Sequence, residues 1–116
     1  MLRIGRLIEM PASTVRLGGM NLPIAGGGYF RLLPYAWTHW GISRVNTAEA
    51  KPVVFYLHPW EADPDQPRFD VGTVTRVRHY TGLNRTIGRL RRLLRDFRFA
   101  TVRSVLSLKP QSGRPC

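Results

Sequence analysis

The sequence predicts a mixed α/β fold, because a short continuous apolar run and two helical patterns occur together in a chain of 116 residues. Residues 52–57 are rich in β-branched and aromatic side chains and are too few for a helix. They predict a strand buried on both faces, as in a parallel sheet covered by helices. A chain of this length forms one small domain that buries only about two thirds of its unfolded surface, so the loss of any packing neighbour would be costly.

The first half of the chain predicts extended structure followed by a helix. Residues 7–17 are expected to be extended, with an interruption at Pro11. Residues 22–28 are rich in proline and glycine and predict a turn. Residues 29–45 carry apolar side chains three to four positions apart, which predicts a helix with Pro34 in its first turn.

The second half predicts the clearest helix. Its apolar stripe is spaced four, three, four and three, and consists of Leu83, Ile87, Leu90, Leu94 and Phe97. Asn84 is the expected N-cap, since its side-chain oxygen can accept from a free first-turn N–H. Residues 101–108 predict a last strand. Residues 109–116 are expected to be a disordered tail, which leaves residues 1–108 as the domain.

The chain is strongly basic, with 18 Lys plus Arg against 7 Asp plus Glu and a net charge of +11. Such a charge suits nucleic acid, anionic lipid or an acidic polysaccharide. All the basic residues except Lys51 and Lys109 are arginine, which a G+C-rich coding sequence would also produce. We favour a solvated helix face for the arginines near residues 85–98, because aromatic stacking positions do not alternate with them.

Cysteine usage and hydropathy exclude several classes. The single cysteine, Cys116, permits neither a disulfide framework nor a Cys-based zinc site. No run approaches the roughly 18 apolar residues of a membrane span. The first residues lack the apolar run of a secretory signal. The sequence does not distinguish a cytoplasmic from a periplasmic location.

His58 is the strongest candidate for chemistry, because it stands where the predicted buried strand ends at Pro59. Polar groups at the C-terminal end of such strands form active sites in α/β folds, and an imidazole can donate or accept a proton near neutral pH. The alternative is a histidine held in a loop hydrogen bond. Glu61 would orient His58 or bind substrate, or else be a solvated loop acid. Trp60 would stack on a sugar ring or cover the core.

The glycine stretch at residues 26–28 precedes a predicted helix and is the second candidate region. Glycines in that position can cradle an anion, although a tight turn is the simpler interpretation. Arg31 would then clamp a substrate or carboxylate. His39 is expected to be structural and His79 to lie on the surface. No His-x-x-x-His or Asp-Asp pair is present for a hydrolytic metal site, and no serine lies in a G-x-S-x-G elbow.

Two strings carry a resemblance to a known family. GGGYFRLLP at residues 26–34 and VFYLHPWE at residues 54–61, followed by DPDQP at 63–67, resemble the C-terminal region of polysaccharide deacetylases. The most similar branch is associated with exopolysaccharide and exosortase loci, where this region is sometimes treated as a domain of unknown function. EMP at 9–11, RHY at 78–80 and LRRLLRDF at 90–97 also match, so the resemblance covers nearly all of residues 6–106.

The resemblance implies a distorted (β/α) barrel, of which this chain would hold the last strands and helices plus an extension, incomplete by itself. Enzymes of that family deacetylate N-acetylated sugars with a divalent metal, often zinc, held by an aspartate and two histidines in an N-terminal half. A second aspartate acts as base, and a histidine near the last barrel strand acts as acid. His58 matches that histidine. Tyr56 stands where a leucine often lines the acetyl pocket.

The resemblance further implies that the metal is held outside these 116 residues, because they lack the Asp-Asp and His-x-x-x-His motifs. The chain alone is therefore expected to be inactive, and the DNA upstream of Met1 is expected to encode those motifs. In the intact enzyme His58 would be the general acid. The implied substrate-binding residues are Trp60, Glu61, Tyr29 and Arg31. The implied partners are an N-acetylated polysaccharide and the missing half of the barrel. The alternative is a non-enzymatic module that binds an acidic polysaccharide, a partner subunit or nucleic acid through its arginines.

Overall fold

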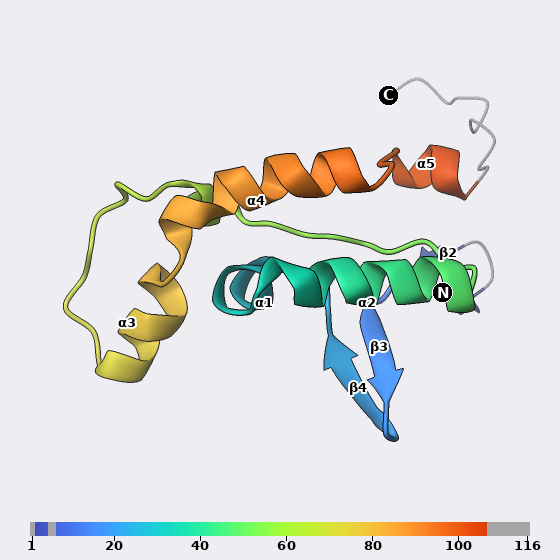
Figure 1. Ribbon diagram of the computed structural model, residues 1–116, viewed down its shortest axis with the longest axis horizontal. Coiled ribbons are helices and arrows are strands. Elements are labelled where there is room, and N and C mark those ends of the chain that lie inside the picture. The colour runs from blue at the N-terminus through green and yellow to red at the C-terminus, as the bar shows by residue number, and fades with distance from the viewer. Residues whose placement is uncertain (1, 5–6, 107–116) are drawn as a thin grey trace.

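The computed structural model describes residues 2–4 and 7–106 and confirms the mixed α/β class. Two antiparallel hairpins come first, β1 (Leu2–Ile4) with β2 (Leu7–Glu9) and β3 (Thr14–Leu17) with β4 (Met20–Pro23). The helical elements are α1 (Gly27–Leu32), α2 (Tyr35–Ala48), the 3₁₀ turn η1 (Pro59–Ala62), α3 (Thr73–Tyr80), α4 (Leu83–Asp96) and α5 (Val102–Val105). In Figure 1, α2 and α4 run side by side with an extended segment between them, and the β3–β4 hairpin projects from α2.

The β3–β4 hairpin confirms the prediction of extended structure in residues 7–17, where β2 and β3 lie on either side of Pro11. Its turn consists of Gly18 and Gly19, whose φ values of 55° and 84° are both in the left-handed region. Two such residues form the type I′ turn that matches the twist of a hairpin. This turn places Leu17 opposite Met20 and fixes the register of the ladder.

The helix predicted for residues 29–45 is two helices. Pro34 does not lie inside a first turn but is the N-cap of α2, with φ −57° and ψ 145°. Leu33, the residue before it, is extended at ψ 157°, because the proline ring disfavours helical backbone in the preceding residue. The break separates the short α1 from α2 and turns the chain between them.

Residues 52–57 are extended, as expected, but they pair with no strand in the part of the chain that the structure describes. The prediction of a hydrogen-bonded strand in a parallel sheet is therefore wrong for these residues. Val53, Phe55 and Leu57 pack against the helices, so one side-chain face is covered. The other face carries the exposed Tyr56. No second strand lies along either edge within the described residues.

The core has two clusters that the extended segment joins. The first contains Val15, Ile24, Ala25 and Val45, and the second contains Phe30, Tyr35, Ile42 and Leu93. Val53 and Phe55 pack against both clusters, and the Phe55 ring meets the Phe30 ring edge-on at 4.9 Å. The segment that ends at His58 is therefore fixed by the core on its inner face.

The helix predicted at residues 83–97 is α4, but its buried face is rotated from the expected stripe. Leu83 and Leu93 are buried, whereas Ile87 and Leu94 are 37% and 54% exposed. Asn84 is not the N-cap, because Gly82, at φ 79°, precedes the helix. A side chain at Gly82 would meet the carbonyl oxygen of Arg31, so the close approach of α1 requires a glycine there.

The C-terminal half also differs from the expectations. The strand predicted at residues 101–108 is wrong for the described residues up to 106, because Val102–Val105 form α5 with the Thr101 hydroxyl accepting from the Ser104 N–H. Helix α3 was not predicted, because its sequence has no apolar stripe. The tail at residues 109–116 lies outside the described residues. No helix of the described chain combines the length and apolar character needed to cross a membrane.

Tyr35 connects α2 to the end of α4. Its hydroxyl donates to Asp96 Oδ2 at 2.6 Å. Burial, this hydrogen bond and the Asp96 charge raise the pKa of Tyr35 to about 12 from an ordinary value of 10.0. The neutral phenol is thus favoured in the folded state. The stabilisation that comes from this raised pKa is fully present below pH 10 and is lost as the pH rises towards 12.

We therefore expect the free energy of unfolding to fall between pH 10 and 12, measured by denaturant titration at each pH. Tyr35→Phe removes the ionisable hydroxyl and should flatten part of that decline. A decline of equal steepness in both proteins would assign it to other groups.

Candidate functional site

A cleft of about 540 Å³ lies between the start of α1, the turn at η1 and helix α3. All five residues proposed from the sequence line it, although they come from two distant stretches of the chain. They are Tyr29, Arg31, His58, Trp60 and Glu61. Tyr56, Thr75, Arg78 and His79 also line it. The fold thus brings the two strings that carry the family resemblance into one site.

His58 is the last extended residue and the N-cap of η1, where Pro59 begins the turn. Its side chain is exposed and lines the cleft. The ring centroid lies 5.9 Å from that of Tyr56 and 6.0 Å from that of Trp60. The imidazole is therefore accessible at the cleft, in contrast to a ring enclosed among apolar side chains.

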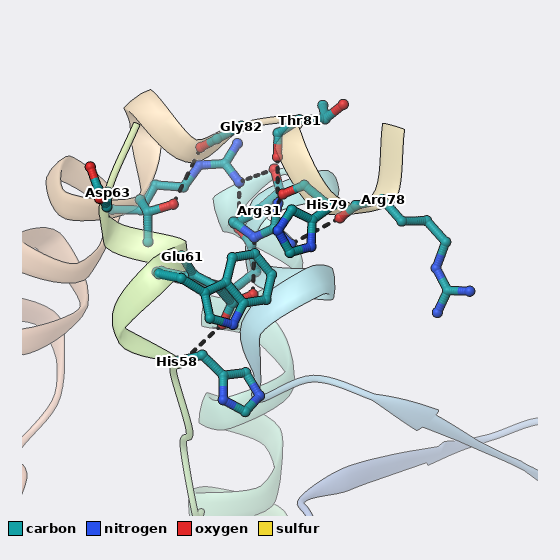
Figure 2. A network of polar contacts seen from close by, with 12 residues as sticks. Arg31, His58, Glu61, Asp63, Arg78, His79, Thr81 and Gly82 are labelled. Atoms are coloured by element: carbon teal, nitrogen blue, oxygen red, sulfur yellow. Dashed lines mark hydrogen bonds and ion pairs between the residues drawn. The ribbon is translucent and has the colours of Figure 1, made fainter. Parts of the chain in front are cut away.

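Glu61 holds the backbone of His58 rather than its ring. Glu61 Oε2 accepts from the His58 backbone N–H at 3.0 Å, and the Glu61 backbone N–H donates back to the His58 carbonyl at 3.0 Å. Glu61 is only 1% exposed, and its other oxygen accepts from Arg31 Nε at 3.0 Å. Figure 2 shows this chain of contacts from Arg31 through Glu61 to His58. Both carboxylate oxygens are engaged inside the protein.

The other two guanidinium nitrogens of Arg31 cap the C-terminal end of helix α3. Nη1 donates to the carbonyls of His79 and Thr81, and Nη2 donates to the carbonyl of Arg78, at distances of 2.8 to 3.0 Å. These carbonyls lie in the last turn of α3, where no helical donor is available to them. Because Arg31 is 3% exposed and donates to Glu61 as well, it forms the floor of the cleft and joins α1, η1 and α3.

The glycine stretch lies against this buried pair. A side chain added at Gly27 would overlap the Glu61 carboxylate, and one added at Gly26 would overlap the Tyr56 ring. The anion beside the start of α1 is thus a carboxylate of the protein itself. Gly26 and Gly27 allow the close approach of residue 56 and η1. The expected tight turn at residues 26–28 is instead the start of α1, whose first two residues are Gly27 and Gly28.

We expect Gly27→Ala to destabilise the chain by about 1–3 kcal/mol, because the added methyl group displaces a buried, doubly engaged carboxylate. Gly28→Ala is the matched control, since nothing lies within 4 Å of a side chain at that position. Urea denaturation followed by tryptophan fluorescence measures both. Equal midpoints for the two variants would contradict the packing of Gly27 on Glu61.

Trp60 and His79 form a stacked pair that the sequence did not predict. Their ring centroids are 4.2 Å apart with an interplanar angle of 9°, and His79 Nε2 lies 3.3 Å from Gln66 Oε1. The Arg31 guanidinium carbon lies 5.1 Å from the Trp60 ring centroid. One face of Trp60 is therefore covered by His79, which is half-buried instead of lying free on the surface.

The arrangement can supply proton transfer and aromatic contacts, but the described residues do not form a metal centre. They contain no group of three or more His, Cys, Asp or Glu side chains that could hold an ion. The Asp65 backbone N–H donates to Asp63 Oδ1 at 3.1 Å, the hydrogen bond of a local turn. A divalent metal does not fit the residues present here.

The family model described as "Domain of unknown function (DUF3473)" matches residues 2–107, which is most of the chain. The chain belongs to the DUF3473 family. No curated protein and no solved structure matches it. The matched region contains the whole cleft, including α1, η1 and α3.

Two arginines of this DUF3473 domain have internal roles that account for part of its basic composition. Arg31 caps α3, and Arg89 donates from Nη1 to the carbonyls of Phe30, Arg31 and Leu33 at the end of α1. Burial, together with the charge of Arg85, lowers the pKa of Arg89 below its ordinary value. Neither guanidinium projects freely from the surface for an external partner.

Proposed function

We propose that this DUF3473 domain is the C-terminal segment of a metal-dependent polysaccharide deacetylase that acts on N-acetylated sugars in exopolysaccharide biosynthesis. In this proposal the chain is inactive alone and contributes His58 as the general acid. The observation that carries it is the exposed imidazole at the cleft, whose backbone is fixed by the buried Glu61–Arg31 pair. The resemblance in residues 26–34 and 54–61 supports the assignment of the reaction.

The chemistry requires two proton movements. Water attacks the acetyl carbon of the N-acetyl group, and the amide nitrogen must gain a proton as the C–N bond breaks. A cationic imidazole on His58 can deliver that proton to the leaving amine, because its exposed side chain lines the cleft. A second group must accept a proton from the attacking water. Glu61 is not free for that step, since both of its oxygens already accept hydrogen bonds.

A divalent metal, zinc in the resemblance, would supply an activated water in the intact enzyme. Its ligands and the base would come from another part of the enzyme, since the described residues do not fit a metal. The residues of this chain would bind and orient the sugar and hold the proton on His58. Tyr29 and Trp60 line the same cleft and would contact the sugar rings.

Two features of the fold support a segment that packs against more protein. Residues 52–57 are extended and packed on helices on one face, yet no strand in the described chain pairs with them. The Cα radius of gyration is 16.9 Å, against roughly 13 Å for a compact domain of about this length. Added strands beside residues 52–57 would satisfy their backbone and place His58 at the end of a sheet.

Acetate release from N-acetylglucosamine oligomers tests the proposal. The pure 116-residue chain with added zinc should release none, whereas the chain produced together with the metal-binding half of a deacetylase barrel should release acetate in a metal-dependent manner. Turnover by the chain alone would contradict the proposal that the metal ligands and the base lie in another part of the enzyme. Absence of turnover in the complete, folded assembly would contradict the assigned reaction.

The runner-up is a non-enzymatic binding module, favoured by the exposed arginines of α4. These are Arg85, Arg91, Arg92 and Arg95. Salt-sensitive binding to an anionic glycan, a partner subunit or nucleic acid that is unaffected by His58→Ala would favour this module, and a salt-dependent gel shift tests nucleic acid directly.

A further inference from the structure

The side chains around the cleft differ sharply in charge. Of the described residues that line it, only Glu61 carries a carboxylate, and Arg31 neutralises that carboxylate in a buried ion pair. The remaining ionisable groups at the cleft that can carry positive charge are Arg78, His58 and His79. The groups left outside the buried pair that can carry charge at neutral pH are thus cationic, so a negatively charged ligand is complementary to the cleft.

Arg78 is the arginine of the described cleft lining that lies outside the buried ion pair. Its backbone carbonyl accepts from Arg31, but its side chain is exposed and makes no hydrogen bond or ion pair with any residue of the described chain. Figure 2 shows its guanidinium extended away from the network that its own carbonyl joins. A guanidinium in this state can bind a carboxylate or sulfate through two parallel N–H donors.

Aromatic side chains stand beside these donors. Tyr29 and Tyr56 line the cleft and are 49% and 45% exposed. Flat rings with a polar tip pack against sugar faces while their hydroxyls remain hydrogen-bonded. Cationic donors next to exposed tyrosines form a surface suited to a charged sugar.

We propose that the cleft binds an anionic sugar residue, so that the polysaccharide recognised by this domain carries carboxylate or sulfate groups. Arg78 binds the anionic group, and Tyr29 and Tyr56 contact the sugar ring. The choice of a sugar rests on the proposed function, whereas the negative charge follows from the cleft itself. A nucleic acid is a poorer fit, because strong phosphate binding uses several basic residues along a groove, and among the described residues that line the cleft only Arg78 is an arginine outside the buried ion pair.

Isothermal titration of the full chain with three oligosaccharides tests this proposal. Hyaluronan oligomers alternate glucuronate with N-acetylglucosamine, keratan sulfate oligomers carry sulfate without uronate, and chitin oligomers are neutral. At low salt we expect at least one anionic oligomer to bind about tenfold or more tightly than the neutral one, as one charge-assisted contact allows. The two anionic probes separate carboxylate from sulfate as the recognised group.

Arg78→Gln should remove most of that preference, and Arg91→Gln should leave it unchanged. Arg78→Gln keeps the backbone carbonyl that Arg31 needs, and Arg91 is an exposed arginine of α4 outside the cleft. Circular dichroism verifies the fold of both variants. If either variant fails to fold, NMR spectra of the unmodified chain test the site instead. The cross-peaks of the cleft residues are expected to shift when the anionic oligomer is added.

Several results would overturn the proposal. These are equal affinity for neutral and anionic oligomers, no binding of any of them, an Arg91→Gln effect as large as that of Arg78→Gln, or tighter Arg78-dependent binding of a single-stranded oligonucleotide. Titration measures binding and not deacetylation. A chain that loses this preference can still complete an active deacetylase, and a chain that keeps it can fail to do so, so the two proposals fail separately.

Discussion

Replacing His58 with alanine in the complete enzyme should lower the turnover number for acetate release by about 10²- to 10⁴-fold, the range for loss of a general acid. The Michaelis constant should change much less, because the cleft keeps its aromatic and cationic lining. The physical reason is that the amine nitrogen would leave without a positioned proton donor. Initial rates over a range of oligomer concentrations separate the two parameters.

A second histidine provides the control for this variant. His39 is exposed on α2, with its ring 5.1 Å from that of Phe97, and it lies outside the cleft. His39→Ala should therefore retain turnover close to that of the unmodified enzyme. Full turnover by His58→Ala would remove His58 from the reaction, whatever the affinity for the sugar.

Glu61→Ala should lower the free energy of unfolding of the chain by about 3–5 kcal/mol, because it leaves the Arg31 charge buried without its partner. The two side chains are 2% and 1% exposed, so water cannot replace the lost carboxylate without rearrangement. The turn at His58 also loses the acceptor for its backbone N–H. Chemical denaturation measures the difference.

The ion pair of Lys51 with Glu49 is the matched control. It has the same 3.0 Å separation, but its side chains are 64% and 37% exposed. Glu49→Ala should cost less than about 1 kcal/mol, as is usual for surface pairs. A Glu61→Ala protein as stable as Glu49→Ala would show that the pair beneath the cleft contributes little to the fold.

Local sequence patterns predicted that His58 stands at the end of an extended segment. They did not predict the Arg31–Glu61 ion pair that holds its backbone. The apolar run at residues 52–57 and the following proline mark the end of an extended segment, and both signals are contained in neighbouring residues. The ion pair between Arg31 and Glu61 joins positions thirty residues apart. No periodicity reports such a contact. The sequence suggested that Arg31 binds substrate and that Glu61 orients His58 or binds substrate, but it did not indicate that the two side chains pair.

The errors in the helices have a similar origin. In α4 the buried face was predicted from the spacing of apolar residues, which included Ile87 and Leu94. Tertiary packing instead buries Thr86 and Leu93 and leaves Ile87 and Leu94 exposed. Helix α3 buries none of its residues, so it lacks the apolar stripe that would have revealed it. His79 was consequently assigned to the surface, and its stacking on Trp60 required the structure. The barrel itself and the deacetylase reaction remain predictions.

The Arg31 guanidinium has a mechanical consequence, because the same planar group ends α3 and supports the turn that carries His58. Release of that helix end removes three carbonyl acceptors from the guanidinium at once, so we expect local opening of α3 and of the His58 turn to be coupled. The amide proton of His58 would then exchange with solvent at the rate at which the far helix opens, although sequence separates the two by about twenty residues.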